Sequence, residues 1–189
     1  GRAGTDGSAE GLRTERAGTD GLADAPRPAT TALGAGLDAQ ASALRERRSG
    51  MRRNDFGPQP LECWIGRVAG VEDVVLPDAL QGWDCRNNQL AWLALQQDGM
   101  AAAVQAAAQR YGAERVAVVM GTSTSSVGAS EEAYTRLVED AHGLRFPDDL
   151  QRPIVHTPHS LGDFVQHATG LRGPAITVAT ACSSSAKVF

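Results

Sequence analysis

Residues 175–185, AITVATACSSS, decide the fold class, because a run rich in β-branched residues leads almost directly into Cys182. Such residues favour strands, so the sequence predicts a strand over residues 175–180, with only a turn between it and the cysteine. A side chain held where a buried strand leads into a helix faces unpaired backbone N–H groups and the positive end of the helix dipole. These stabilise a thiolate, which makes Cys182 a candidate nucleophile. A buried structural cysteine before a helix is the alternative.

A helix followed by a strand is predicted upstream of this turn. The alanine-rich segment over residues 84–112 predicts a single helix, with Asp84 as its N-terminal cap and Gly112 as its stop. A continuous apolar run follows over residues 116–120. An uninterrupted run of this kind is typical of a strand buried on both faces.

The same order is repeated immediately before Cys182. Apolar residues at helical spacing predict a helix behind Ser160, whose hydroxyl would cap it while Asp163, three residues on, completes a capping box. Gly170 is expected to end this helix, and the strand over residues 175–180 follows. Helices that alternate with buried strands are typical of an α/β fold.

The beginning of the chain has a different composition. Residues 1–28 contain RAGTDG twice and almost no large apolar side chains, so they are predicted to be a disordered, low-complexity segment. Folding is expected over residues 29–189, starting with a short amphipathic helix that buries Leu37, Ala41 and Leu44 and ends by Gly50. Residues 61–77 then predict extended pieces and loops.

Composition and charge exclude several classes of protein. A chain of 189 residues suits one ordinary domain. The formal net charge of -4, with both signs mixed throughout, argues against nucleic acid and anionic membranes as partners. No run of about 18 apolar residues could span a bilayer, and the first residues lack the apolar core of a secretory signal. We therefore expect a cytoplasmic protein.

The cysteines and histidines predict neither a disulfide framework nor a metal site. The three cysteines lie far apart without a C-x-x-C pair, and Cys63 and Cys85 are expected to be buried apolar fillers. His156 and His159 flank a proline in HTPH, which favours a loop over a ligand pair because the spacing suggests no third ligand.

Several motifs together resemble a known family. The TACSSS motif, preceded by GLRGPAITVA, is similar to the nucleophile motif of the β-ketoacyl-acyl-carrier-protein synthases, condensing enzymes of the thiolase-like superfamily. Four upstream motifs resemble the N-terminal half of the same family in the same order. They are TALG over residues 31–34, ALRERRSGMRRNDF over 43–56, WDCRNNQLAWLALQ over 83–96 and VAVVMGTSTSSVGASEEAY over 116–134.

The resemblance implies a thiolase-like, layered α/β fold, of which this chain would be the N-terminal half, truncated after the strand, turn and helix of the nucleophile. It implies that Cys182 accepts an acyl chain from a carrier-protein thioester, and that its backbone N–H is one donor of the oxyanion hole. Malonyl carrier protein is then decarboxylated, and its carbanion attacks the acyl enzyme. The implied partners are acyl carrier protein and a second subunit, in a homodimer or a ketosynthase-like heterodimer. No cofactor is implied.

The glycine-rich stretch GTSTSSVG, residues 121–128, resembles the family's loop near the acyl pocket and dimer contact. The substrate-binding residues that it predicts are Gly121, Thr122, Ser123 and Gly128. A phosphate cradle is the competing interpretation of a glycine-rich loop after a strand. It lacks both the G-K-[ST] and the G-x-G-x-x-G pattern that such a cradle uses.

The chain departs from the family in its histidines. The family's two catalytic histidines and its supporting lysine come from the C-terminal half, whereas all four histidines here precede Cys182 and none lies in a matching motif. The chain on its own is therefore expected to form no condensation product. A non-catalytic ketosynthase-like fragment or interaction module is the alternative function. A cysteine hydrolase is less favoured, because it would need a histidine downstream of the nucleophile.

Overall fold

The computed structural model describes residues 26–57 and 59–189. The segment predicted to be disordered lies outside the described residues up to position 25. Residues 26–28, its last three, have no regular secondary structure and lead into β1 (Thr30–Thr31). Within the described ranges, no helix is both long and apolar enough to cross a lipid bilayer.

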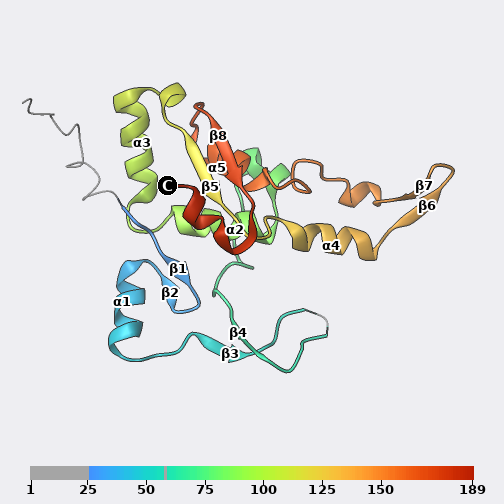
Figure 1. Ribbon diagram of the computed structural model, residues 1–189, viewed down its shortest axis with the longest axis horizontal. Helices are drawn as coiled ribbons and strands as arrows, with labels where there is room; N and C mark the ends of the chain where they lie inside the picture. Colours follow the sequence, from blue (N-terminus) through green and yellow to red (C-terminus); the bar gives the residue numbers. More distant parts are fainter. Residues whose placement is uncertain (1–25, 58) are drawn as a thin grey trace, which may run out of the picture.

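The centre of the fold is a pair of parallel strands, β5 (Val118–Gly121) and β8 (Ala175–Val178). Helix α5 (Ser160–Thr169) precedes β8 and lies against both strands, and α2 (Arg86–Leu95) packs on α5 (Figure 1). The order is therefore sheet, helix and helix in successive layers. Parallel strands with a helical crossover require helices on the sheet, so the predicted α/β class is confirmed.

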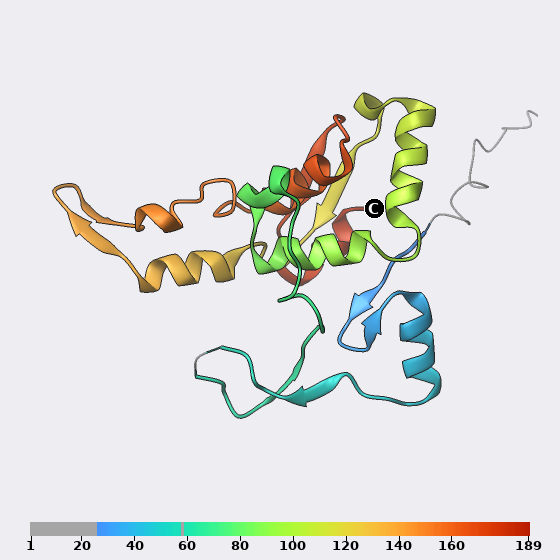
Figure 2. The same cartoon turned by 180° about the vertical axis from the view of Figure 1, so that it is seen from behind.

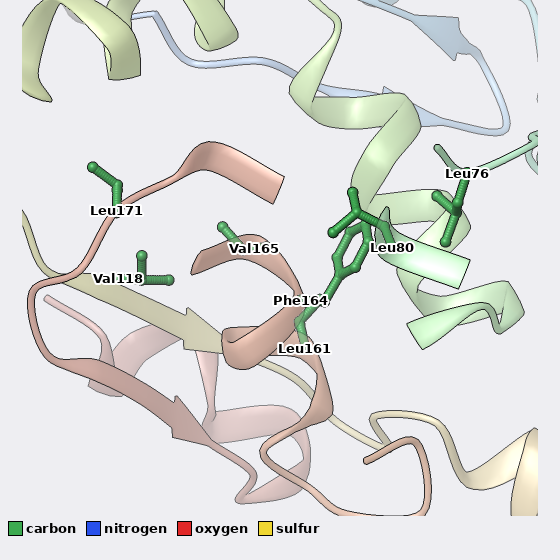
Figure 3. Close-up of a cluster of buried hydrophobic side chains, with 7 residues drawn as sticks. All are labelled: Leu76, Leu80, Val118, Leu161, Phe164, Val165 and Leu171. Atoms are coloured by element: carbon green, nitrogen blue, oxygen red, sulfur yellow. The ribbon is translucent and has the colours of Figure 1, made fainter. Parts of the chain in front are cut away.

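The core lies between α5, β5 and the 3-10 helix η1 (Asp78–Trp83). Seven buried side chains make up this cluster, and Figure 3 shows the ring of Phe164 directed from α5 toward Leu80 and Leu76. Its members are Leu76, Leu80, Val118, Leu161, Phe164, Val165 and Leu171. The helical spacing of Leu161, Phe164 and Val165 places all three on the face of α5 that is buried.

The single helix predicted over residues 84–112 is two helices. Helix α2 ends at Leu95 and α3 (Met100–Tyr111) begins after a turn in which Asp98 and Gly99 both have positive φ angles, of 51° and 75°. Aspartate and glycine tolerate this left-handed conformation. A right-handed α-helix cannot continue through it, so the helix is interrupted here. Asp84 is not the cap of α2, because Cys85 occupies that position. Gly112 ends α3 as predicted.

Ser160 does not cap α5. His159 occupies the N-cap position without a side-chain hydrogen bond, and Ser160 is the first residue of the helix. Its fully buried hydroxyl accepts a hydrogen bond of 3.1 Å from the side-chain amide of Asn88, which joins α5 to α2. The predicted stop at Gly170 is confirmed, since that residue has the left-handed conformation typical of a helix end.

Strand β5 is buried on one face only, although the sequence predicts burial on both. Val118 is buried under α5, whereas Val119 is 41% exposed and its register partner on β8, Ile176, is 52% exposed. Gly121 lies on the same face as Val119 and abuts the backbone of Ser184. Among the described residues, this second face is therefore covered at the end of β5 and left open along Val119.

The remaining elements extend from this centre (Figures 1 and 2). The N-terminal part holds β1, β2 (Gly34–Ala35), α1 (Leu37–Arg45), β3 (Met51–Arg53) and β4 (Trp64–Gly66). Helix α4 (Val127–Thr135) leads into the antiparallel pair β6 (Val138–Asp140) and β7 (Gly143–Arg145), which projects away from the sheet. Helix α1 ends at Arg45 rather than near Gly50, and it buries Ala43 while Leu37 and Leu44 are exposed.

Candidate functional site

Cys182 lies in a turn just beyond the carboxyl end of β8. The turn consists of two short 3-10 helices, η4 (Ala181–Ser183) and η5 (Ser185–Lys187), where the sequence predicts the start of an α-helix. Ala181 has a φ angle of 51°, and Cys182 itself is exposed. A non-glycine residue adopts this left-handed conformation only when the surrounding structure fixes it. The turn therefore presents the thiol at the sheet edge through a constrained backbone.

The constraint comes from Ser184, whose side chain points inward. Ser184 is 2% exposed, and its hydroxyl accepts a hydrogen bond of 2.8 Å from the backbone N–H of Thr180. The same hydroxyl lies 2.8 Å from the carbonyl oxygens of Thr122 and Ala181, to either of which it can donate. Ser184 thus connects the two residues before Cys182 with the loop after β5.

The loop after β5 supports the turn from the other strand. The Thr122 N–H donates to the Val178 carbonyl at 3.0 Å, and the buried Thr122 hydroxyl accepts from the Ser125 N–H at 2.8 Å. Ser123 is exposed, and its hydroxyl lies 3.4 Å from the Ala181 carbonyl oxygen. The loop and the cysteine turn are therefore one hydrogen-bonded unit at the carboxyl edge of the sheet.

The family model of the β-ketoacyl synthase N-terminal domain matches residues 87–189, more than half of the chain and including the whole site. The chain belongs to the β-ketoacyl synthase family. The resemblance carried by the TACSSS motif and the upstream motifs is thereby confirmed, and with it the thiolase-like α/β fold.

A solved structure of a ketosynthase is similar to most of this chain. It is the ketosynthase ApeO in complex with its chain length factor ApeC, from Xenorhabdus doucetiae, with 30% sequence identity and a TM-score of 0.63. The match covers 84% of this chain and 39% of that one, so this chain spans well under half the length of its structural neighbour. No curated protein matches.

Three of the four predicted substrate-binding residues adjoin the cysteine turn. Gly121 is the last residue of β5, and Thr122 and Ser123 follow it in the loop that holds the turn. Gly128 lies in the first turn of α4, where a Cβ atom would meet nothing within 4 Å. A cavity of about 240 Å³ lies between this loop, α4 and Ala179 just after β8. Substrate binding by these four residues stays a prediction.

The three free cysteines differ in environment. Cys85 is buried, and burial raises the pKa of its thiol, so it is an apolar filler as predicted. The same prediction is wrong for Cys63, which is exposed in the loop before β4. The residues next to Cys63 and Cys85 in the sequence cannot predict which cysteine is buried, because the burial of each depends on segments distant in the sequence.

The two histidines of the HTPH segment differ in their contacts. Both ring nitrogens of His156 have protein partners, with Nδ1 3.0 Å from the Ser130 hydroxyl and Nε2 2.8 Å from the Leu150 carbonyl oxygen. His159 is exposed. In the part of the chain that the structure describes, no group of three or more histidine, cysteine or acidic side chains could hold a metal ion.

Gly121→Ala is expected to displace the cysteine turn. An added Cβ atom would lie 3.0 Å from the Ser184 carbonyl group and 3.1 Å from the Ser185 nitrogen, and backbone atoms cannot rotate away. Overpacking of this kind costs about 1–3 kcal/mol, so we expect a drop of that size in the free energy of unfolding in urea. Gly128→Ala is the matched control, because its Cβ enters open space and a helical alanine is favoured over glycine. Equal destabilisation by both substitutions would contradict the expected contact.

Proposed function

We propose that this protein accepts an acyl group on Cys182 and extends it by decarboxylative condensation with a malonyl carrier-protein thioester. The observation that carries the proposal is the exposed thiol of Cys182 on a constrained turn at the carboxyl edge of the parallel strands, in a chain of the β-ketoacyl synthase family. Because the chain spans 39% of its ketosynthase neighbour, the complete reaction is proposed for the complete protein.

The first proposed step is transthioesterification. The Cys182 Sγ atom attacks the carbonyl carbon of an acyl-carrier thioester, and the backbone N–H of Cys182 stabilises the oxyanion. The carbon–sulfur bond to the carrier then breaks, and the carrier thiol leaves with the proton that Cys182 lost. In the second step, loss of CO₂ from the malonyl group gives a carbanion that attacks the acyl enzyme. A new carbon–carbon bond forms, and the Cys182 thiolate is released.

The test is intact-mass measurement after incubation of the protein with an acyl-carrier thioester, followed by peptide mapping. We expect one added acyl group per molecule, located on Cys182. The exposed Cys63 serves as an internal reference for thiol accessibility in the same molecule. An acyl group on Cys63 with Cys182 unmodified, or a folded protein that gains no mass, would overturn the proposal.

We also propose that the protein associates with a second subunit of ketosynthase type, as a homodimer or a heterodimer. The support is the solved neighbour, which is a ketosynthase in complex with its chain length factor. Such pairing would also suit the alternative function of a non-catalytic interaction module. Light scattering coupled to size exclusion distinguishes these states: a monomer at all accessible concentrations excludes the homodimer, and failure to bind a co-expressed second ketosynthase-like subunit excludes the heterodimer.

A further inference from the structure

The hydroxyl of Ser184 connects the ends of both parallel strands beneath Cys182. We propose that Ser184 is a positioning residue, which holds the Cys182 turn in the geometry needed for acyl transfer. The inference rests on the proposed function, because it concerns the rate at which Cys182 is acylated. Its basis is the set of hydrogen bonds made by one buried hydroxyl.

The site needs a group that both accepts and donates. The Thr180 N–H requires an acceptor, and the same hydroxyl lies 2.8 Å from the Thr122 carbonyl oxygen, across the gap between strands, and from the Ala181 carbonyl oxygen, to either of which it can donate. A hydroxyl has one proton to donate and lone pairs to accept, so it satisfies both. Since Ser184 is 2% exposed, bulk water does not reach the position to replace it. An apolar side chain there would leave buried backbone groups unpaired.

The same hydroxyl acts on the residue that precedes the nucleophile. Ala181 has the left-handed conformation, and its carbonyl oxygen is contacted by both the Ser184 hydroxyl at 2.8 Å and the Ser184 N–H at 3.1 Å. The orientation of Ala181 determines the direction of the next peptide N–H and of the next Cα–Cβ bond. Ser184 therefore fixes where the thiol and the backbone N–H of Cys182 point.

The middle serine of the three that follow Cys182 is the one directed inward. Ser183 is exposed, and among the described residues its hydroxyl forms hydrogen bonds only with Thr180 of the same turn. Ser185 is also exposed, and among the described interactions its hydroxyl makes no side-chain hydrogen bond. Gly121 makes room for the inward residue, since its missing side chain lets the Ser184 backbone approach β5. Ser185 thus provides a matched control of the same residue type.

The test compares Ser184→Thr with Ser184→Val, because threonine and valine have the same shape and only threonine carries a hydroxyl. Ser184→Ala is measured as well, and Ser185→Ala is the control. The rate of acylation is measured by mass at saturating acyl thioester, and the concentration giving half the maximal rate is measured separately. Misplacement of a reacting group by about 1 Å can cost on the order of 10²-fold in rate. We expect Ala and Val to slow the saturated rate by about that factor, with the half-saturating concentration nearly unchanged and the rate restored by Thr.

The outcomes separate this inference from the proposed function. Equal rates for the Thr and Val variants would overturn the role of the hydroxyl. If both the Thr and the Val variants are unfolded, as judged by circular dichroism, the Ser184→Ala variant tests the role of the hydroxyl instead, because alanine adds no atom. A rate per folded molecule equal to that of Ser185→Ala would then overturn the inference while leaving the proposed function intact. An unsubstituted protein that is never acylated would overturn both.

Discussion

Cys182→Ala is expected to abolish acylation of the protein. The substitution removes the thiol that the turn after β8 presents at the carboxyl edge of the paired strands. An alanine methyl group cannot form a thioester. After incubation with an acyl-carrier thioester, the intact mass of the variant should remain that of the unmodified chain. The circular dichroism spectrum should be unchanged, because the exposed thiol contributes little to packing.

The other two cysteines provide the controls for this result. Cys63→Ala should be acylated as the unsubstituted protein is, because Cys63 is exposed but lies in a loop before β4, away from the paired strands. Cys85→Ala should also retain acylation, since burial raises the pKa of the Cys85 thiol and keeps it protonated at neutral pH. Acylation of Cys182→Ala to the extent of the unsubstituted protein would remove Cys182 from the mechanism.

The local features around Cys182 could be predicted because they depend on neighbouring residues in the sequence. A β-branched run that ends in small residues predicts a strand and a turn, and β8 followed by η4 has this form. The helical spacing of Phe164 and its neighbours likewise identified the buried face of α5. In both cases the residues that determine the structure lie within a few positions of one another.

The features that were missed depend on tertiary contacts. The break at Asp98 is stabilised by a distant interaction, in which the Leu37 N–H donates to the Asp98 carboxylate at 3.1 Å. Ser160 has the sequence context of a cap, but Asn88 of α2 provides a partner for its hydroxyl inside the core. The exposure of Val119 depends on which elements cover the second face of the sheet. Hydrophobic periodicity within one segment contains none of this information.

Ser184 shows the same limit within the site. Cys182 was identified from its turn, and the family resemblance pointed to the loop at Gly121 that proved to adjoin it. Three consecutive serines give no indication of which one is buried. The geometry of successive 3-10 turns directs only Ser184 toward Thr122. The D-G pair at Asp98 was an available signal for a turn, whereas no comparable signal marks Ser184.

Phe164→Ala is expected to give the largest loss of stability. The Phe164 ring is fully buried between α5 and η1, where it contacts the cluster that joins the helical layer to β5 (Figure 3). Removing a buried phenylalanine ring costs about 3–5 kcal/mol, through lost transfer free energy and the cavity that remains. The free energy of unfolding of a native protein is about 5–15 kcal/mol, so this loss is a large fraction of its stability. Urea unfolding followed by circular dichroism measures it.

The location of the ring, rather than the size of the truncation, should decide this loss. Leu61→Ala also removes a large apolar side chain, but Leu61 is 78% exposed, so its effect should stay within about 0.5 kcal/mol. Phe164→Leu should fall between the two, because leucine refills part of the cavity. Since α5 supports both strands beneath the cysteine turn, Phe164→Ala should also slow acylation per molecule in proportion to the unfolded fraction. A Phe164→Ala protein as stable as Leu61→Ala would contradict the placement of the core between α5 and η1.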